Sequence, residues 1–183
     1  MAPLDIHTYD DPILRETARP IETITDRHRS LAADMSKTMY EANGIGLAGN
    51  QVGVTERVIV VDVDWVARSE EAREPIRQPV PMINPEVFEE DDEDDVFKEG
   101  CLSLPEIQGE VWRPMWIRYR YTDLDGRIRE QKADGMLARC ILHEVDHLNG
   151  VLFIDRMAPN ERRKLAGKLS KLRRARSNLF QLW

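Results

Sequence analysis

The sequence predicts an α+β fold in a single compact domain, with antiparallel or mixed sheets around a central helix and a further helix at the C-terminus. Helical periodicity occurs early in the chain and again towards its end, whereas β-branched runs and hairpin signals gather between them. Strands and helices that are segregated rather than alternating are typical of α+β proteins. With 183 residues the chain can bury its own core, so we expect residues 1–183 to form one domain.

The composition indicates a globular protein without a membrane segment. Hydrophobic residues make up 42% and charged residues 32% of the chain, and no apolar run approaches the roughly 20 residues that cross a bilayer. The first residues, Met1–His7, lack the basic start and apolar stretch of a secretion signal. We therefore expect a cytoplasmic protein that does not bind membranes, in which the thiols of Cys101 and Cys140 stay reduced.

The first part of the chain predicts a helix, a loop and a strand. Asp11–Arg15 is typical of a short turn. Apolar residues recur at helical spacing from Thr25 to about Ala42, and the Asn43-Gly44 pair supplies a stop, so we expect a helix here. A glycine-rich loop follows at Gly44–Gly53, and the β-branched residues of Arg57–Val63 indicate a buried strand.

The middle of the chain predicts loops and extended segments. Trp65–Gln78 favours a solvated loop, and Pro79–Phe88 favours an extended segment interrupted by prolines. The acidic run Glu89–Asp95 is typical of a solvated edge or loop, and we assign it no function.

A hairpin and a buried helix follow. Side chains alternate along Val111–Tyr121, and the turn residues Asp123–Gly126 lead into Arg127–Lys132, which indicates a β-hairpin. Met136–Leu148 has apolar residues all round, as expected of a central buried helix.

The C-terminal segment predicts a basic amphipathic helix over about residues 159–176. Its apolar positions are Leu165, Leu169 and Leu172. The net charge of the chain is -7, yet Arg156–Trp183 holds nine Lys or Arg against one acid. This polarity indicates that the tail has its own binding partner or contact surface.

The pattern that carries chemistry is H-E-x-x-H, at residues 143–147. Residues four apart share a helix face, so the imidazoles of His143 and His147 can bind one metal ion while Glu144 moves the proton. Two core histidines that meet by chance would give the same spacing, but the intervening glutamate within an apolar helix favours a metallohydrolase.

A catalytic ion needs a third protein ligand, and both cysteines are candidates. Cys140 lies seven residues from His147, or about 10.5 Å of helix rise, so three ligands on one helix would be awkward. Cys101 is the better candidate, because a glycine before it and a proline soon after suit a strand that breaks to present a side chain. A thiolate and two imidazoles satisfy zinc and ferrous iron alike, so the residues leave the metal open.

The glycine-rich loop ends in Gln51, whose side-chain amide is able to donate to a developing oxyanion. This signal is weak by itself, since glycine-rich turns are mostly structural. The loop follows a helix rather than a strand, which argues against a dinucleotide-binding fingerprint.

Taken together, these three segments resemble the peptide deformylase family. The family's motifs are G-x-G-L-A-A-x-Q, E-G-C-L-S and H-E-x-D-H, and Gly44–Gln51, Glu99–Ser103 and His143–His147 match them in that order. The similarity extends to Asp11–Arg15 and Leu152–Asp155, so it covers nearly the whole chain.

The resemblance implies removal of the formyl group from the N-terminal formylmethionine of new polypeptides, with Fe²⁺ as the usual ion and Zn²⁺, Ni²⁺ or Co²⁺ as alternatives. It implies that Cys101, His143 and His147 bind the metal and that Glu144 is the general acid and base. The oxyanion would be held by Gln51 and the backbone N–H of Leu102. The substrate would contact Ile45, Gly46, Met136 and Cys140.

This sequence departs from the family's pattern at two positions. Gly49 stands where the family usually has alanine, and Leu142 where it usually has glutamine. Glycine loosens a turn and leucine lacks the hydrogen bonds of an amide, so these changes question fine positioning more than activity.

Two other functions compete with deformylation. An H-E-x-x-H endopeptidase would normally take its third ligand from a histidine or glutamate after the helix, but only Glu161 follows His147. A non-catalytic protein that uses the metal as a structural staple and the basic tail as an RNA-binding arm would need neither Glu144 nor Gln51. In a deformylase, the tail would either pack on the body as a solvated helix or dock on ribosomal RNA near the nascent-chain exit. Formate release from a formyl-Met peptide separates the three functions.

Overall fold

The computed structural model describes residues 3–73 and 76–180. Its helices are η1 and η2 of the 3-10 type (Pro12–Arg15 and Gly49–Val52), α1 (Asp26–Glu41), α2 (Trp65–Ala72), α3 (Gly135–Leu148), α4 (Phe153–Arg156), α5 (Pro159–Lys164) and α6 (Ala166–Phe180). Its strands are β1 (Gly46–Ala48), β2 (Val58–Val61), β3 (Val80–Glu90), β4 (Asp94–Cys101), β5 (Leu104–Pro114), β6 (Trp116–Thr122) and β7 (Ile128–Asp134). The α+β prediction is confirmed.

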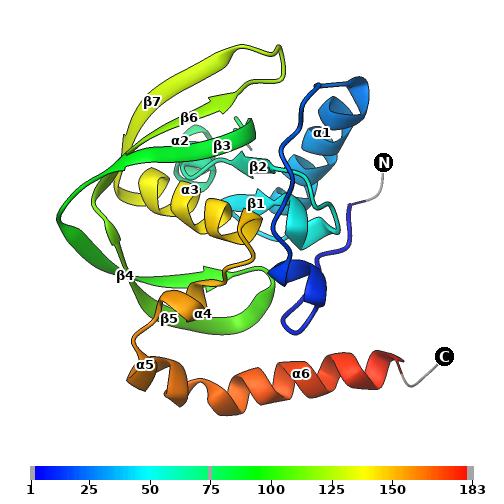
Figure 1. The fold of residues 1–183 in the computed structure, drawn as a ribbon, viewed down its shortest axis with the longest axis vertical. Helices are drawn as coiled ribbons and strands as arrows, with labels where there is room; N and C mark the ends of the chain where they lie inside the picture. Colours follow the sequence, from blue (N-terminus) through cyan, green and yellow to red (C-terminus); the bar gives the residue numbers. More distant parts are fainter. Residues whose placement is uncertain (1–2, 74–75, 181–183) are drawn as a thin grey trace.

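The strands form two antiparallel sheets around α3. One sheet has the order β1-β2-β3-β6-β7 and the other consists of β4 and β5. Figure 1 shows α3 enclosed between the larger sheet and the β4–β5 pair, with α1 beside β1 and β2. Of the two predicted alternatives, antiparallel or mixed, the named strands therefore adopt the antiparallel one.

β2 is buried on both faces, which explains its unbroken β-branched sequence. Successive side chains of a strand point to opposite faces. Val58 and Val60 pack in a cluster with Met35 and Met39 of α1, whereas Ile59 lies in the cluster that contains α3 residues. The predicted strand at this position is confirmed, and it separates α1 from the central helix.

The predicted hairpin is also present, as β6 and β7. Its register places Trp116 opposite Asp134 and Thr122 opposite Ile128. In the turn, the Asp123 carboxylate accepts hydrogen bonds from backbone N–H groups, and Gly126 has a φ of 82°. The strand predicted from Val111 to Tyr121 is interrupted, however, because β5 ends at Pro114 and β6 begins at Trp116 in the other sheet.

The central helix α3 is buried along most of its length, as its apolar composition predicted. The large cluster around it includes Ala138, Ile141, Leu148 and Leu142. Leu142 therefore lies in an apolar environment, where an amide would need hydrogen-bond partners. Its departure from the family's glutamine is consistent with this packing.

The predicted loop at Trp65–Gln78 was wrong in its first part, which forms α2. Trp65 starts this helix because its ring packs on Tyr40 at 5.5 Å between centroids and its Nε1–H donates to the Gly44 carbonyl at 2.9 Å. No residue of α2 is buried. The sequence did not predict this helix, because it lacks the apolar stripe of an ordinary amphipathic helix.

The acidic run Glu89–Asp95 is exposed, as predicted, but it connects two strands rather than forming one loop. β3 continues to Glu90 and β4 begins at Asp94. The Glu89 carboxylate pairs with Arg118 across the sheet at 3.3 Å. The β4–β5 pairing that follows had not been predicted as a hairpin.

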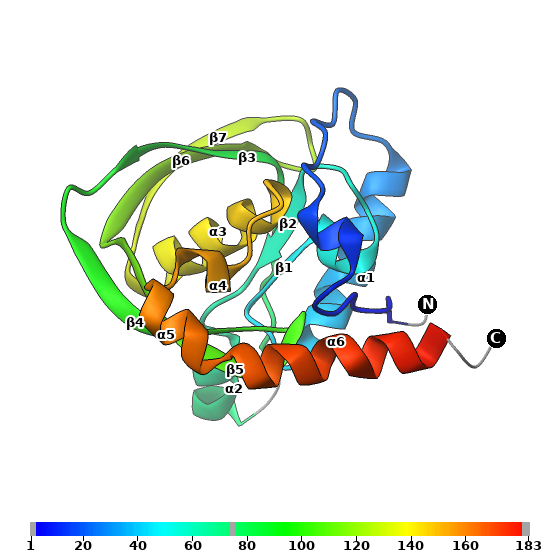
Figure 2. The same cartoon turned by 60° about the horizontal axis from the view of Figure 1, so that its bottom comes forward.

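The C-terminal helix is two helices, α5 and α6, which meet near Leu165. Leu169 is buried and packs in a cluster with Leu14, Leu104 and Phe153, and Leu165 lies against the same cluster. Figure 2 shows α6 running across the molecule past β5. Packing on the body is therefore confirmed. Within the described parts of the chain, no helix is long and apolar enough to cross a membrane.

Candidate active site

Three side chains that bind metal ions in proteins meet where the end of β4 faces α3. The sulfur of Cys101 and one ring nitrogen each of His143 and His147 lie within 4.8 Å of one another. Cys101 Sγ is 3.2 Å from His147 Nε2. The histidines are one turn apart on α3, and a register shift after Gly100 accompanies the end of β4 at Cys101. The structure thus brings together the three residues that the sequence suggested as ligands.

The donor set fits a divalent metal ion. A thiolate and two imidazoles are ligands that zinc and ferrous iron both accept. Burial lowers the pKa of His147 well below its usual value, which keeps this imidazole neutral. The Oε2 atom of Glu144 is buried without a hydrogen-bond partner in the described residues, as expected of a carboxylate that faces a reactant.

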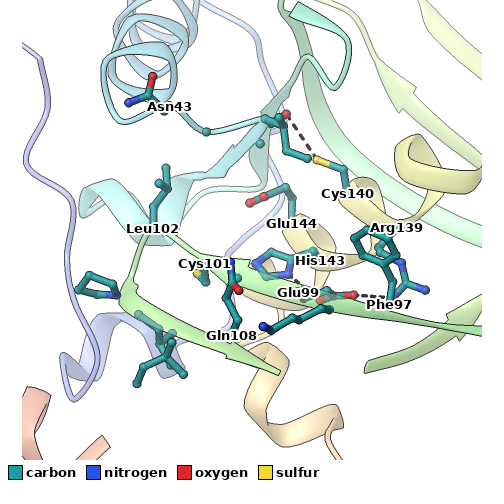
Figure 3. A pocket seen from close by; sticks show the side chains of 18 of the residues that line it. Asn43, Phe97, Glu99, Cys101, Leu102, Gln108, Arg139, Cys140, His143 and Glu144 are labelled. Atoms are coloured by element: carbon teal, nitrogen blue, oxygen red, sulfur yellow. Dashed lines mark hydrogen bonds and ion pairs between the residues drawn. The ribbon is translucent and has the colours of Figure 1, made fainter. Parts of the chain in front are cut away.

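Glu144 lies on α3 beside these ligands. It points into a cavity that Cys101 and His143 also line (Figure 3). Burial raises the pKa of its carboxyl to about 7. A group with such a pKa both accepts and releases a proton near neutral pH. Gly46 permits its position, because a Cβ atom at residue 46 would lie 2.4 Å from Glu144 Oε1 and 2.7 Å from the sulfur of Cys140.

Glu99 is the site residue to which the sequence analysis assigned no role. Its carboxylate accepts a 3.0 Å hydrogen bond from Nδ1 of His143 and two bonds of 2.7 and 3.0 Å from Arg113. Burial alone would raise the pKa of Glu99, but these contacts hold it well below its usual range. Because Nδ1 of His143 donates to Glu99, the proton of the neutral imidazole is on Nδ1, and Nε2 is free to bind an ion. Its place two residues before Cys101 in the quoted motif was the available signal.

The Glu99 contact belongs to a network of ion pairs behind the ligands, buried except at Arg156. Arg113 of β5 also donates to Asp146 of α3 at 2.8 Å, and Asp146 accepts from Arg156 of α4 at 2.6 Å. Arg139 adds a 2.9 Å bond to Glu99. Because removal of one member would leave a buried charge unpaired, the network ties the second sheet firmly to α3.

Gln51 lies on η2 with its amide directed at the ligand group. Its Oε1 accepts a 2.9 Å hydrogen bond from the backbone N–H of Ala48. Its Nε2 donates to Ser103 Oγ at 3.1 Å and lies 3.5 Å from Cys101 Sγ. Leu102 follows Cys101 directly and lines the same cavity. Both predicted oxyanion donors therefore lie beside the ligands.

A cavity of about 690 Å³ opens in front of these groups. Its lining includes all four residues that the resemblance implied for substrate contact, namely Ile45, Gly46, Met136 and Cys140. The sulfur of Cys140 lies 3.5 Å from the Ile45 carbonyl oxygen, and burial raises the pKa of this thiol well above its usual value. Cys140 is thus a neutral wall residue, whereas Cys101 is the cysteine in the ligand group.

Comparison with known proteins identifies the family. The profile of the polypeptide deformylase family matches residues 3–163. The chain belongs to this family. Among curated peptide deformylases, that of Rhizorhabdus wittichii is 48% identical over 91% of the chain and 93% of its own length. That of Alkalilimnicola ehrlichii is 46% identical over 98% of the chain and 96% of its own length.

Solved deformylase structures have the same fold. The enzyme of Thermotoga maritima superposes with a TM-score of 0.78 at 39% identity, covering 87% of this chain and all of its own. The enzyme of Synechococcus elongatus, solved in complex with actinonin, gives 0.80 at 37% identity over 97% of this chain and 89% of its own. Deformylases are metal-dependent hydrolases, and the activity of this chain is removal of the N-formyl group from nascent peptides.

Proposed function

We propose that this chain acts as one catalytic domain, residues 1–183, that hydrolyses the formyl group of N-terminal formylmethionine and releases formate. The observation that carries the proposal is the meeting of three ligand atoms within 4.8 Å, beside a buried Glu144 carboxylate whose Oε2 has no hydrogen-bond partner among the described residues. Nascent peptides in the cytoplasm are the substrate.

One divalent ion is held by Cys101, His143 and His147. When bound, it supplies Lewis-acid chemistry, which polarises the formyl oxygen and makes water more acidic. We assign Fe²⁺ to this site on the family resemblance. Metal analysis of protein purified without oxygen tests the assignment, and zinc as the active form would contradict it.

Glu144 moves the proton. With a pKa near 7, it takes the proton of the attacking water and then delivers it to the amine that leaves. Negative charge develops on the formyl oxygen during the attack. In this proposal the Nε2–H of Gln51 and the backbone N–H of Leu102 stabilise this charge, because donors that are oriented in advance need no reorganisation.

The methionine side chain enters the apolar part of the cavity, lined by Ile45, Gly46, Met136 and Cys140. A neutral Cys140 suits this role, because a thiol in apolar surroundings behaves as a small hydrophobic side chain. Met136 is 40% exposed, so it lies at the rim, where an unbranched side chain adapts to the substrate.

Formate release from a formyl-Met peptide tests the proposed function, with the matching acetyl-Met peptide as control. We expect a new free amine from the formyl peptide alone, because the proposed activity is specific for the formyl group. Cleavage of an internal bond in an unformylated peptide would instead support the endopeptidase. An ion that binds without any turnover would support the structural staple.

In this proposal the basic C-terminal helix docks on ribosomal RNA. Some of its basic side chains, however, already form ion pairs within the chain. Arg162 pairs with Asp155 at 3.2 Å and Arg173 with Asp10 at 3.1 Å. Lys164 pairs with Glu161 at 2.6 Å. Among the described side chains of these two helices, the other exposed basic residues are Arg163, Lys168 and Lys171. These three are therefore the first candidates for phosphate contact.

Replacement of Arg163, Lys168 and Lys171 by alanine tests the docking without exposing the leucines beneath α6. We expect weaker cosedimentation with ribosomes and a log–log salt slope reduced by about 2 to 3. Replacing the exposed Lys37, Arg29 and Arg27 of α1 serves as a charge-matched control. Binding that is unaffected by the three tail substitutions, or independent of salt, would contradict docking through this helix.

A further inference from the structure

Ser103 is a buried hydroxyl beside the site that the proposed function leaves without a role. It is fully buried and is the last residue of the E-G-C-L-S motif. Its Oγ accepts the 3.1 Å hydrogen bond from Nε2 of Gln51. A serine hydroxyl and a glutamine amide that lie 52 residues apart in the sequence therefore form a direct, buried contact.

Ser103 and Ala48 together determine the orientation of the Gln51 amide. The Ala48 N–H donates to Oε1 at 2.9 Å, which places the amide oxygen away from the ligands. Nε2 carries two hydrogens. One is directed at Ser103 Oγ, and the nitrogen lies 3.5 Å from Cys101 Sγ. The other N–H points toward Cys101 Sγ, and so toward the ligand group where the formyl oxygen is expected.

The backbone strengthens the same connection. We call residues 7–9 the N-terminal strap. The His7 N–H donates to the Gln51 carbonyl at 2.8 Å, and the Tyr9 N–H donates to the Ser103 carbonyl at 2.7 Å. The strap thus bridges η2, which carries Gln51, and the turn between β4 and β5, which carries Leu102 and Ser103. Both proposed oxyanion donors belong to segments joined by Ser103 and the strap.

We infer that Ser103 is a positioning residue for deformylation: its hydroxyl holds the Gln51 amide so that one N–H faces the reacting formyl oxygen. This inference rests on the proposed function, since it requires Gln51 to stabilise the oxyanion. A donor that is already oriented stabilises developing charge without reorganising. Without the hydroxyl, the buried amide has one unsatisfied N–H, which favours rotation away from the productive orientation.

Steady-state kinetics on the metal-loaded enzyme with a formyl-Met peptide test this inference in four forms: wild type, Ser103→Ala, Gln51→Ala and the double variant. We expect Ser103→Ala to lower kcat about tenfold with little change in KM, and Gln51→Ala to lower it about 100-fold. In the Gln51→Ala background, Ser103→Ala should have almost no further effect, because its contribution acts through the amide. Ser103→Thr keeps the hydroxyl and should restore most of kcat.

Metal content and thermal unfolding of each variant separate positioning from a general structural role. Ser36→Ala is the matched control, because Ser36 is also a buried serine but donates to the Ala32 carbonyl within α1. It should lower stability alone and leave kcat unchanged.

The outcomes distinguish the two proposals. Unchanged kcat in Gln51→Ala would refute the oxyanion role itself. A large loss in Gln51→Ala with none in Ser103→Ala would overturn only the role of Ser103. The inference would be overturned if Ser103→Ala lowered kcat by the same factor in wild type and in Gln51→Ala. Loss of the metal ion from Ser103→Ala would overturn it too, because either result would assign Ser103 a general structural role.

Discussion

At the scale of single residues, the site depends on how α3 and β4 surround each functional group. The Glu144 carboxylate has no partner among the described residues at Oε2, whereas Glu99 accepts four hydrogen bonds from His143, Arg113 and Arg139. Two carboxylates close to the same ligands therefore have opposite properties. The pKa of Glu144 is raised by burial and that of Glu99 is lowered by its partners, which suits proton transfer by the first and orientation of a ligand by the second.

Replacing Glu144 with alanine should lower kcat by a factor on the order of 100 or more, because the reaction loses its proton carrier. The metal content should stay the same, since Glu144 is not in the ligand group. Formate-release kinetics and metal analysis of the same sample measure both effects. Glu110→Ala, an exposed position on β5, is the control. Near-normal turnover in Glu144→Ala would rule out its proposed role.

The two cysteines should respond differently to the same substitution. Cys101→Ser should lose the ion or most of the activity, because a hydroxyl replaces the thiolate in the ligand group. Cys140→Ser should keep the ion, since its sulfur contacts the Ile45 carbonyl in the cavity wall. Metal-to-protein ratios after dialysis measure the difference. The reverse result would exchange the roles of the two residues.

Gly49→Ala should destabilise this chain even though the family usually has alanine there. A Cβ atom at residue 49 would lie 2.8 Å from the Val54 carbonyl oxygen and 2.9 Å from that of Glu56. Backbone atoms must shift to admit the methyl group, at a cost of about 1–3 kcal/mol. Urea unfolding measures this loss.

Gly167→Ala is the matched control for this substitution. No described atom lies within 4 Å of a Cβ built at Gly167, so alanine should raise stability there by up to about 1 kcal/mol through helix propensity. Unchanged or increased stability in Gly49→Ala would mean that the backbone of residues 54–56 shifts at little cost to admit the methyl group.

At the scale of elements, α6 is a cover for the second sheet as well as a carrier of positive charge. Leu169 is 8% exposed and packs in one cluster with residues of η1, β5 and α4. The same helix reaches the N-terminal strap, because Arg173 pairs with Asp10 at 3.1 Å and lies over the Tyr9 ring. One side of α6 therefore contributes to stability, and its exposed basic residues remain available for binding.

Leu169→Ala should lower the free energy of unfolding by about 2 kcal/mol, since a buried leucine leaves a cavity when truncated. The kcat of the folded enzyme should not change, because Leu169 does not line the active-site cavity. Lys168→Ala, the exposed neighbour on the same helix, should change stability by no more than about 0.5 kcal/mol. Equal effects of the two substitutions would show that α6 is not held by its leucines.

At the scale of the whole molecule, buried carboxylates make stability depend on pH. Burial alone would raise the pKa of Asp62, but hydrogen bonds from Tyr40, Arg68 and the Gln78 N–H outweigh it and hold the pKa below its usual value. A carboxyl whose pKa is lower in the folded state stabilises the fold above the unfolded pKa of about 3.9. This stabilisation is lost as the pH falls through the folded-state pKa.

Asp62→Asn should therefore lower stability at pH 7 by about 1.5–3 kcal/mol. The difference from wild type should shrink as the pH falls below about 4, because the wild-type carboxyl then becomes neutral too. Urea unfolding of metal-free protein from pH 7 to pH 3 measures this difference while avoiding proton competition at the ligands. A difference that does not vary with pH would show that Asp62 stabilises the fold through packing instead of charge.

The sequence by itself determined the features that depend on neighbours along the chain. The spacing of His143 and His147, the β-branched run of β2 and the turn before β7 follow from local periodicity and turn chemistry. The local sequence also singled out Cys101 and Gln51 as candidates, and the resemblance to a family supported both. By contrast, α2 was missed because it has no apolar stripe, and its start depends on Trp65 packing against a distant tyrosine.

Only the tertiary structure decided which distant groups touch. Glu99 meets His143 and Arg113, and Ser103 meets Gln51, across 44, 14 and 52 residues of sequence. Such contacts arise because β5 packs against η1, α4 and α6, and α3 packs against the larger sheet, to bury apolar clusters. This burial has no direction along the chain. The ligand set of this deformylase-family site was therefore visible in the sequence, whereas the groups that orient the ligands and the oxyanion amide became visible only in the fold.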